Sequence, residues 1–498
     1  MKFSQVIQVL ESAGLCPEPV PVPAGDPEIA DACTRTDQVR PGALYCCVRG
    51  LKSDGHGYAA EAGRKGAAAL LAEHPLDIPL PVAVVKDARK AAAIAAASVH
   101  GFPADKLALA AVTGTNGKST TAWITRSILR AGGIPCGLLG TIVYDDGRVE
   151  EPGDRTTPDG PSVQRWMARM AANGSRACVM EASSHGLDLD RLEGCRFDAL
   201  AFTNLTPEHL DFHGDMEGYF RSKLRLFSDH ARPQARFALN IDDPYGRRLA
   251  ELFPERAIPY GTGTEAELCA SILEMSLDGT TMDIRLPGQN KPLRTKSPLV
   301  GLHNVSNVLA AAGLALALGI GPEVIREGIG KVSPVPGRLQ RFRFENGVTC
   351  FIDYAHTPDG LEKALRAVGT NCRGAVHAVF GLGGERTVEN RPLMGAVAAR
   401  LADHVIITMD NPRSENPMAI ARQIEQGLEG PRLRCHSVIL DRGEAVRAAL
   451  EQARPGDVVL LAGKGPETTM ILADGPVPYN DEENVLAWGK SRGLSFAR

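Results

Sequence analysis

The sequence contains no pair of cysteines in C-x-x-C spacing, although 11 cysteines are scattered along its 498 residues. This absence argues against the common zinc sites and dithiol redox sites. We expect reduced thiols that are mostly buried, as free cysteines usually are. No stretch approaches the roughly 18 uninterrupted apolar residues of a membrane-spanning helix. The first ten residues also lack the charged and apolar regions of a secretory signal. We therefore expect a cytoplasmic protein with no membrane insertion.

An excess of positive charge is also missing. The formal net charge is -4, and no basic cluster is interleaved with aromatic residues. Proteins that bind a phosphate backbone need such an excess, so we expect no nucleic acid partner. The glycines at 381–384 do not complete the pattern G-x-G-x-x-G. This argues against a nicotinamide-dependent oxidoreductase.

The length and the turn signals predict three domains. A chain of 498 residues exceeds what one hydrophobic core usually supports. An alanine-rich stretch, Ala91 to Ala97, and a turn at 101–103 indicate a first boundary, and Val335-Pro336-Gly337 indicates a second. The predicted domains are 1–103, 104–336 and 337–498.

The last third of the sequence alternates apolar runs with helix-like segments. The runs are Val348 to Ile352, Val376 to Phe380, Val405 to Thr408, Val438 to Leu440 and Val458 to Leu461. This alternation predicts an α/β fold with a parallel sheet and helices on both faces. Polar or glycine-rich clusters directly follow four of the five runs. Because ligands bind beyond the carboxyl ends of such strands, we expect a site along that edge.

A phosphate-binding loop is predicted between an apolar run, Leu107 to Val112, and a helical pattern that stops at Gly132-Gly133. Free amides and the helix dipole at such a junction favour an anion. The loop residues and the first helical residues that we expect to bind ATP are Gly114, Thr115, Asn116, Gly117, Lys118, Ser119 and Thr120.

Within this loop, Lys118 would contact the β and γ phosphates, and the Ser119 hydroxyl would bind magnesium. Val112 stands where the usual eight-residue motif has its first glycine, so the match is to a shortened form. The alternative is a tight turn at the start of a helix.

Two further clusters could supply the oxygen-rich surroundings that magnesium needs beside ATP. Glu181 directly follows the apolar run Ala177 to Met180, which places it at a strand end. Taken alone, such a glutamate is a solvated loop residue about half the time. The stretch His209 to Gly214 carries two histidines near carboxylates. Isolated histidines are more often packing or surface residues.

The ordered motifs together resemble one family, the Mur ligases, and specifically the branch that makes a muramoyl-tripeptide precursor of peptidoglycan. The motifs are G-T-N-G-K-S-T at Gly114, T-T-P at Thr156, M-E-A-S-S-H at Met180, T-N-L-T-P-E-H-L-D-F-H-G at Thr203, F-R-S-K at Phe220, N-V-S-N at Asn304, G-R at Gly337, D-Y-A-H-T-P at Asp353, R-P-L-M-G at Arg391, D-N-P-R at Asp410 and G-K-G at Gly463. Any one of these motifs would be weak evidence, whereas their ordered sequence is very specific.

The resemblance implies a three-domain α/β fold. It consists of an N-terminal domain for the uridine nucleotide, a central P-loop ATPase-like domain with a mostly parallel sheet, and a C-terminal Rossmann-like domain.

The resemblance also implies the reaction: the D-glutamyl carboxylate of UDP-MurNAc-L-Ala-D-Glu takes the γ phosphoryl group of ATP. The amine of an amino acid then attacks the acyl phosphate. Phosphate is the good leaving group that a carboxylate lacks, and magnesium would ease the charge in both steps. We expect a monomer.

Residue roles follow from the resemblance at matching positions. Glu181 and His209 resemble magnesium ligands, and Lys223 matches a lysine that this family carbamylates. Two cations about 4 Å apart repel by roughly 4 kcal/mol at an effective dielectric near 20, and carbamylation would reverse that sign. The alternative for Lys223 is an exposed helix lysine. The residues that resemble contacts to the adenine, ribose and phosphates are Asn304, Arg338, Asp353 and His356, and those that resemble contacts to the muramoyl-dipeptide are Thr156, Thr157, Ser184 and Arg191.

The D-N-P-R motif, Asp410-Asn411-Pro412-Arg413, is the form that in this family accompanies meso-2,6-diaminopimelate rather than lysine. Diaminopimelate carries a second carboxylate, which an arginine fork can bind with two hydrogen bonds. Arg386, Gly463 and Glu467 match other family positions around this amino acid, with Glu467 suited to the distal ammonium. Taken alone, D-N-P-R would be a good turn.

Three stretches depart from the family pattern. G-G-D-R-D is replaced by Gly383-Gly384-Glu385-Arg386-Thr387, and G-K-G-H-E by Gly463-Lys464-Gly465-Pro466-Glu467. The N-terminal D-S-R, which contacts the uridine nucleotide, is replaced by Cys33-Thr34-Arg35, so Thr34 takes the serine position.

The sequence leaves three alternative functions open. The same ligase could use L-lysine or another diamino acid, or the chain could resemble folylpolyglutamate synthetase, against which D-N-P-R and the N-terminal domain argue. A protein of another class would use the loop to bind or hydrolyse ATP as a conformational switch without forming a ligase product.

Overall fold

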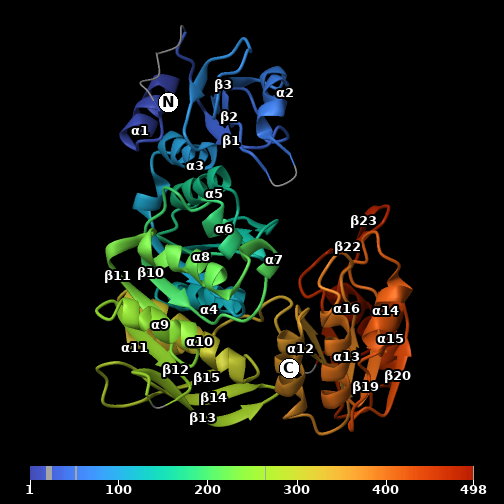
Figure 1. The fold of residues 1–498 in the computed structure, drawn as a ribbon. Coiled ribbons are helices and arrows are strands. Elements are labelled where there is room, and N and C mark those ends of the chain that lie inside the picture. Colours follow the sequence, from blue (N-terminus) through green and yellow to red (C-terminus); the bar gives the residue numbers. More distant parts are fainter. Residues whose placement is uncertain (18–24, 51–52, 264, 497–498) are drawn as a thin grey trace. The chain divides into compact units, whose positions relative to one another are not determined.

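Parallel β-sheets organise the chain, which is described from a computed structural model. The described residues are 1–17, 25–50, 53–263 and 265–496 (Figure 1). They divide into two compact units. The first unit comprises Met1–Cys269, Arg285–Gln289 and Asn307–Gly328, and the second comprises Ala270–Ile284, Asn290–Ser306 and Ile329–Arg498.

The N-terminal part of the first unit is a small parallel sheet covered by helices. Its strands, in spatial order, are β1 (Asp31–Cys33), β2 (Ala43–Cys46), β3 (Ala67–Ala72) and β4 (Val82–Val84). Its helices are α1 (Phe3–Ser12), α2 (Ala59–Arg64) and α3 (Ala88–Val99). The predicted alanine-rich helix is α3, and its small side chains let it pack closely with α1 on one face of this sheet.

The rest of the first unit is a larger sheet whose middle is parallel. Its strands, in spatial order, are β12 (Ala257–Gly261), β11 (Ala231–Asn240), β10 (Phe197–Phe202), β5 (Ala108–Thr113), β9 (Ala177–Glu181), β6 (Cys136–Leu139), β7 (Val143–Asp145) and β8 (Glu150–Pro152). Its helices are α4 (Lys118–Ala131), α5 (Gly160–Ala172), α6 (Ser184–Asp188), α7 (Leu210–His213), α8 (Met216–Ser228) and α9 (Pro244–Leu252). The predicted strand, loop and helix around Gly114 are therefore confirmed as β5, a tight loop and α4.

Five further elements follow β12 in the chain. They are β13 (Leu268–Ser276), β14 (Gly279–Arg285), β15 (Leu293–Ser297), α10 (Leu302–Ala317) and α11 (Pro322–Gly330). Four of them have residues in both units, whereas β15 belongs to the second unit alone. The helix predicted from Asn304 to Leu318 corresponds to α10.

The second unit contains a six-stranded sheet with helices on both faces, as predicted. Its order is β16 (Gln340–Arg343), β17 (Thr349–Asp353), β21 (Val458–Ala462), β18 (Val376–Phe380), β19 (His404–Ile407) and β20 (Cys435–Val438), and all but β16 are parallel. One face packs against α12 (Pro358–Gly369), α13 (Asn390–Leu401) and α14 (Pro417–Glu425), and the other against α15 (Arg442–Gln452) and α16 (Asp481–Ser491). A hairpin of β22 (Thr469–Leu472) and β23 (Gly475–Pro478) completes the unit.

One predicted strand was misplaced. We expected a strand at Val438 to Leu440, but β20 is Cys435–Val438 and only its last residue overlaps. The first three residues of β20 are exposed because it is an edge strand, so they carry no apolar pattern. Ile439 and Leu440, which produced the apolar signal, pack against the cores beyond the end of the strand.

All eleven cysteines lie within the described residues and have free thiols, and eight of them are buried. This confirms the expectation from the sequence. Among the described residues, no helix combines the length and apolar character needed to cross a membrane.

Candidate active site

The phosphate loop begins at the end of the buried central strand β5, which pairs with β9 on one side and β10 on the other. Gly117 caps the N-terminus of α4 with a φ of 87°. A Cβ atom at this position would lie 2.3 Å from Asn307 Oδ1, so both the backbone conformation and the available space require glycine. The loop is therefore fixed by its backbone and directs the start of α4 toward the carboxyl edge of the sheet.

Hydrogen bonds with the segment that follows the neighbouring strand β10 hold this loop. Thr115 N donates to Asn204 O at 2.8 Å, and Asn116 N donates to Asn204 Oδ1 at 3.0 Å. In return, the Thr203 hydroxyl donates to Asn116 O at 2.6 Å. The T-N-L motif after β10 thus clamps the loop. Thr120 is buried in the first turn of α4.

Two lysines converge on a single carbonyl of the loop. Lys118 Nζ donates to Gly114 O at 2.9 Å, and Lys223 Nζ donates to the same oxygen at 3.0 Å. Lys223 is only 1% exposed, and its ammonium lies 4.4 Å from the centre of the Tyr219 ring. Burial, and secondarily the charge of Lys118, lower the pKa of Lys223 well below its ordinary value. The alternative of an exposed helix lysine is therefore wrong, because α8 presents this residue to the loop.

Glu181 ends β9 and is 2% exposed, at the strand end predicted for it. Its Oε2 accepts a hydrogen bond from Ser119 Oγ at 3.0 Å and another from Thr141 Oγ1 at 3.1 Å. Thr141 Oγ1 also lies 3.0 Å from Thr156 Oγ1. These contacts join the loop serine, the glutamate and one expected substrate residue in one oxygen-rich cluster. Thr141 was not identified from the sequence because it belongs to none of the recognised motifs.

The two histidines near α7 lie in an aromatic cluster. The His209 ring lies 4.7 Å from that of His185, and His213 stacks on Tyr219 at 4.9 Å. His213 Nε2 lies 2.9 Å from the hydroxyl of Ser184. Burial is the main cause of the lowered pKa values of His185, His209 and His213, so these rings favour the neutral form.

Three expected substrate residues of this unit remain. Thr157 and Arg191 lie near the end of β9, and Thr34 lies in the N-terminal sheet region. Thr157 Oγ1 donates to Glu181 O at 2.8 Å, and Arg191 Nη1 donates to Thr157 O at 2.8 Å. Burial and the nearby charge of Arg155 lower the pKa of Arg191. Two guanidinium groups near each other suit an anionic substrate. Thr34 is half-buried just after β1.

The other expected nucleotide residues belong to the second unit. Asn304 is buried in α10 and donates from Nδ2 to Val300 O at 2.8 Å. Asp353 ends β17 and accepts from the amides of Leu339 and Ala355 at 2.7 and 2.9 Å. Burial raises the pKa of Asp353.

Tyr354, the residue after Asp353, joins two of the expected nucleotide residues. The Arg338 guanidinium lies 4.8 Å from the centre of the Tyr354 ring. His356 Nδ1 lies 2.7 Å from Tyr354 O.

The D-N-P-R residues follow β19. Asp410 and Asn411 are buried, and Arg413 has a φ of 53°. Arg413 Nη1 donates to Gly384 O at 2.5 Å. A Cβ atom at Gly383 would lie 2.9 Å from Arg413 Nη1 and 3.6 Å from Arg386 Cγ. The two arginines expected to bind the amino acid therefore border the same glycine, although they are separated in sequence. Pro412 closes this loop by accepting from Glu415 N.

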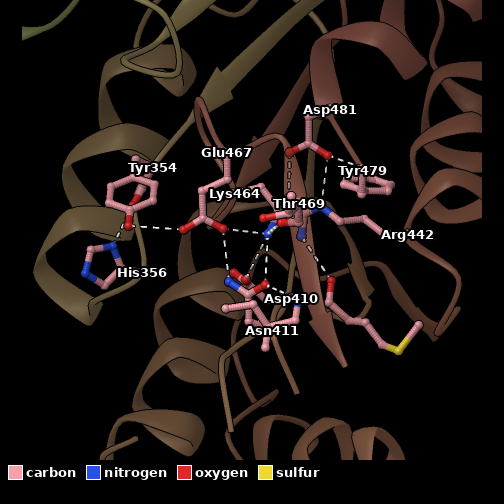
Figure 2. Close-up of polar contacts among 12 residues, drawn as sticks. Tyr354, His356, Asp410, Asn411, Arg442, Lys464, Glu467, Thr469, Tyr479 and Asp481 are labelled. Carbon is pink, nitrogen blue, oxygen red and sulfur yellow. Dashed lines mark hydrogen bonds and ion pairs between the residues drawn. The ribbon is translucent and has the colours of Figure 1, made fainter. Parts of the chain in front are cut away.

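Glu467, whose side chain is 31% exposed, is the centre of a polar network (Figure 2). Its Oε1 accepts from the Tyr354 hydroxyl at 3.2 Å, and its Oε2 accepts from Asn411 Nδ2 at 3.0 Å and from Lys464 Nζ at 2.5 Å. A Cβ atom at Gly463 would lie 2.5 Å from Asp410 Oδ2, so the loop after β21 packs directly against that carboxylate. The predicted amino-acid residues are thus brought together at the carboxyl edge of this sheet.

A fully buried ion pair lies beside the residues that are expected to bind the amino acid, the proposed amino-acid pocket. Arg442 and Asp481 are both 0% exposed at their side chains, and they form two hydrogen bonds of 2.9 and 2.8 Å. Arg442 also donates to Ala462 O at the end of β21 and to Met409 O just after β19. Figure 2 shows this pair beside Asp410 and Lys464. The pair links the ends of two strands that carry the pocket loops.

Three supporting residues were given no role from the sequence. Tyr354 and Lys464 lie inside recognised motifs, and only the structure shows that both contact Glu467. Arg391 is 1% exposed and donates to both carboxylate oxygens of Glu415, at 2.9 and 3.0 Å. Because Glu415 lies two residues after Arg413, its ion pair with Arg391 links the D-N-P-R loop to α13.

The donor set at the phosphate loop fits magnesium. Among the described residues, no three His, Cys, Asp or Glu side chains are grouped to hold a metal ion. Magnesium usually binds one or two protein oxygens together with phosphates and water rather than a protein cage. The hydroxyl of Ser119 and the carboxylate of Glu181, 3.0 Å apart, are such oxygens.

Models of known families match three consecutive segments. They are the Mur ligase family catalytic domain at residues 33–112, the Mur ligase middle domain at 112–315, and the Mur ligase glutamate ligase domain at 337–465. Two curated relatives carry the name UDP-N-acetylmuramoyl-L-alanyl-D-glutamate--2,6-diaminopimelate ligase. The one from Geobacter metallireducens is 40% identical over 90% of this chain and 92% of its own length. The one from Geobacillus kaustophilus is 41% identical over 94% of this chain and 96% of its own.

A solved structure with the same ligase name is 28% identical. The match covers 99% of this chain and 100% of that one, with a TM-score of 0.68. The architecture of that ligase type is therefore present along the whole chain, in three domains with mostly parallel sheets. From these similarities, the chain belongs to the Mur ligase family.

Proposed function

We propose that this chain is an ATP-dependent ligase that joins meso-2,6-diaminopimelate to the D-glutamyl carboxylate of UDP-MurNAc-L-Ala-D-Glu. The observation that carries the proposal is the 40% identity to a ligase of that name over 90% of the chain. A second support is the pocket of the second unit, where Arg386 and Arg413 border Gly383. An arginine pair suits the distal carboxylate that distinguishes diaminopimelate from lysine.

Three domains would divide the work. Residues 1–103 would hold the uridine nucleotide, with Thr34 among its contacts, 104–336 would bind ATP, and 337–498 would bind the amino acid. Family segments that meet at residue 112 and resume at 337 support this division.

In the first step, a D-glutamyl carboxylate oxygen attacks the γ phosphorus of ATP, which forms an acyl phosphate and releases ADP. The loop amides and Lys118 would stabilise the phosphate oxygens, while Asn304, Arg338, Asp353 and His356 would contact the nucleotide. Thr156, Thr157, Ser184 and Arg191 would orient the muramoyl-dipeptide. Arg191 can donate to a substrate carboxylate with its planar fork.

In the second step, the diaminopimelate amine attacks the acyl carbon, phosphate leaves, and the amine loses a proton. Arg386, Arg413 and Asn411 would orient the amino acid, and Glu467 would accept its distal ammonium. Asp410 and Gly463 would shape the same pocket. Positioning of this kind supplies much of the rate gain in two-substrate reactions.

Ser119, Glu181 and His209 would hold magnesium, which when bound offsets the negative charge on the phosphate oxygens. We also propose that Lys223 is carbamylated. The lowered pKa favours the neutral amine that reacts with carbon dioxide. The carbamate would place an anion beside Lys118 that could bind magnesium.

The chain would act as a monomer in the cytoplasm, where free thiols such as these eleven persist. Light scattering of the purified protein would test the monomer. Coverage above 90% by diaminopimelate ligases favours this reaction over folate glutamylation.

The test is product analysis by mass spectrometry. The protein is incubated with Mg-ATP, UDP-MurNAc-L-Ala-D-Glu and, separately, diaminopimelate, lysine, ornithine or glutamate. We expect one diaminopimelyl addition accompanied by release of ADP and phosphate. A lysine adduct would replace the proposed amino acid, and ATP hydrolysis without any amide product would indicate the switch protein instead.

A further inference from the structure

Lys464 places a buried cation among the residues of the proposed amino-acid pocket. Its side chain is 0% exposed, and its Nζ donates to Asn411 Oδ1 at 3.0 Å and to Glu467 Oε2 at 2.5 Å. It also donates to Thr469 O and lies 4.0 Å from Asp410 Oδ1 (Figure 2). An ammonium is costly to bury unless acceptors surround it. All these acceptors belong to the loops that carry the expected amino-acid residues, so Lys464 holds these loops together.

The first effect of Lys464 is on Asn411. An amide side chain can present either its oxygen or its nitrogen to a neighbour, whereas an ammonium can only donate. Lys464 therefore fixes Oδ1 toward itself, where Oδ1 also accepts from Ile471 N at 2.9 Å. This orientation turns Nδ2 toward Glu467, to which it donates at 3.0 Å.

The second effect is on the charge of the pocket. Asp410 and Glu467 bring two carboxylates, and Arg442 is already paired with Asp481. Lys464 is the cation that touches Glu467 directly, so that carboxylate is balanced from within the protein. A ligand ammonium that approaches Glu467 therefore meets two carboxylates that share one lysine, which is one unit of negative charge fewer than without Lys464.

The two candidate amino acids differ in the net charge of their distal ends. Lysine ends in an ammonium, with net charge +1. Diaminopimelate ends in an ammonium and a carboxylate, with net charge zero. Because Lys464 offsets one of the two carboxylate charges, it weakens the attraction for a lone cation, whereas the zwitterion gains the arginine contacts through its carboxylate.

We propose that Lys464 is a positioning residue that sets the preference for a zwitterionic over a cationic distal group, by holding Asn411 and balancing Glu467. The inference rests on the proposed function, in which these residues bind the amino acid. Without Lys464, Glu467 becomes an uncompensated carboxylate that attracts lysine, while Asn411 loses its fixed orientation for diaminopimelate.

The test compares two substrates in Lys464→Met, which keeps the chain length and removes the charge. Steady-state kcat/KM is measured for diaminopimelate and for lysine, together with KM for ATP. We expect the diaminopimelate KM to rise about 10-fold and the lysine-to-diaminopimelate ratio of kcat/KM to rise at least about 10-fold, as for a lost charged contact. The ATP KM should stay within about 2-fold. Lys490→Met, an exposed lysine on α16, is the matched control and should change neither ratio.

Equal losses for both amino acids in Lys464→Met would show a merely structural lysine and overturn the proposal. If that variant does not fold, Glu467→Gln gives the opposite test. It leaves Lys464 unbalanced, so the lysine-to-diaminopimelate ratio must fall, and a rise or no change would overturn the proposal. Failure of the proposed function is distinguishable, because the unmodified protein would then form no diaminopimelate product.

Discussion

The phosphate loop and the amino-acid pocket both lie beyond the carboxyl ends of parallel strands, but different parts of the chain set their geometry. The loop is one contiguous segment, residues 114–117 between β5 and α4, and it is fixed largely by backbone conformation, as the φ of 87° at Gly117 shows. The pocket is a network of side chains from three separate loops, centred on Glu467. The loop should therefore fail as a whole when its backbone is disturbed. The pocket should lose affinity or change preference one contact at a time.

The largest effect is expected from a change in the backbone of the phosphate loop at Gly117. In Gly117→Ala the added methyl would lie 2.3 Å from Asn307 Oδ1, and the left-handed conformation costs about 1–2 kcal/mol. We expect ATP-dependent turnover to fall at least about 100-fold, because aligned amides at the phosphates are lost. Calorimetry with ADP and phosphate-release kinetics would measure the effect. Gly133→Ala, with a φ of 67° and nothing within 4 Å of its Cβ, carries only the strain and should bind ADP normally. Normal ADP binding by Gly117→Ala would refute the backbone account.

A substitution of Lys223 tests whether one side chain near the loop contributes as much to turnover as the loop backbone does. We expect Lys223→Ala to lose about 100-fold or more in kcat, the scale of a single lost group that stabilises charge. Short carboxylic acids should restore part of the activity, because they can supply the missing oxygen of the carbamate. Arg221→Ala, an exposed residue on the same helix, should be normal without any addition. An absence of rescue at every concentration would count against carbamylation.

Arg413 should show that the pocket fails selectively. In Arg413→Ala we expect the diaminopimelate KM to rise about 10- to 100-fold, as for a lost charge-assisted hydrogen bond. The ATP KM should stay nearly constant, because Arg413 is proposed to touch only the amino acid. Initial-rate kinetics with each substrate varied would separate the two. Arg400→Ala, on the surface of α13, is the control. Equal losses for both substrates would contradict this role.

Tyr354 should give the smallest effect. Tyr354→Phe removes only the hydroxyl that donates to Glu467 Oε1 at 3.2 Å. Because Lys464 and Asn411 still hold the other oxygen, we expect about a 2- to 10-fold rise in the diaminopimelate KM. The ring that packs against Arg338 remains, so the ATP KM should not change. A rise in the diaminopimelate KM as large as that of Arg413→Ala would contradict the view that each contact of the network contributes separately.

The same difference explains what the sequence could predict. The strand, loop and helix of the phosphate site were predicted correctly because glycines, an apolar run and a helical pattern are adjacent in the chain. Four of the five strand positions in the last third were also correct, since those strands are buried and apolar. The fifth failed because β20 is an exposed edge strand.

The contacts that were missed are those between distant segments. Lys223 could be taken for an exposed helix lysine because nothing in the sequence of its own helix indicates that its Nζ donates a hydrogen bond to Gly114 O, more than a hundred residues earlier. Thr141 has no motif, and its role follows only from its hydrogen bonds to Glu181. For Lys464 the motif was visible, but its acceptors on Asn411 and Thr469 became apparent only when the loops were assembled in space.

The buried pair of Arg442 and Asp481 has a consequence for how ligands are chosen. Because it joins the end of β21 to the segment after β19, we expect the loops that carry Gly463 and Asp410 to move together. An incoming amino acid then encounters a preformed shape and spends little of its binding free energy on ordering the protein. Discrimination between similar diamino acids becomes a matter of equilibrium fit, and it should persist even when catalysis is slowed.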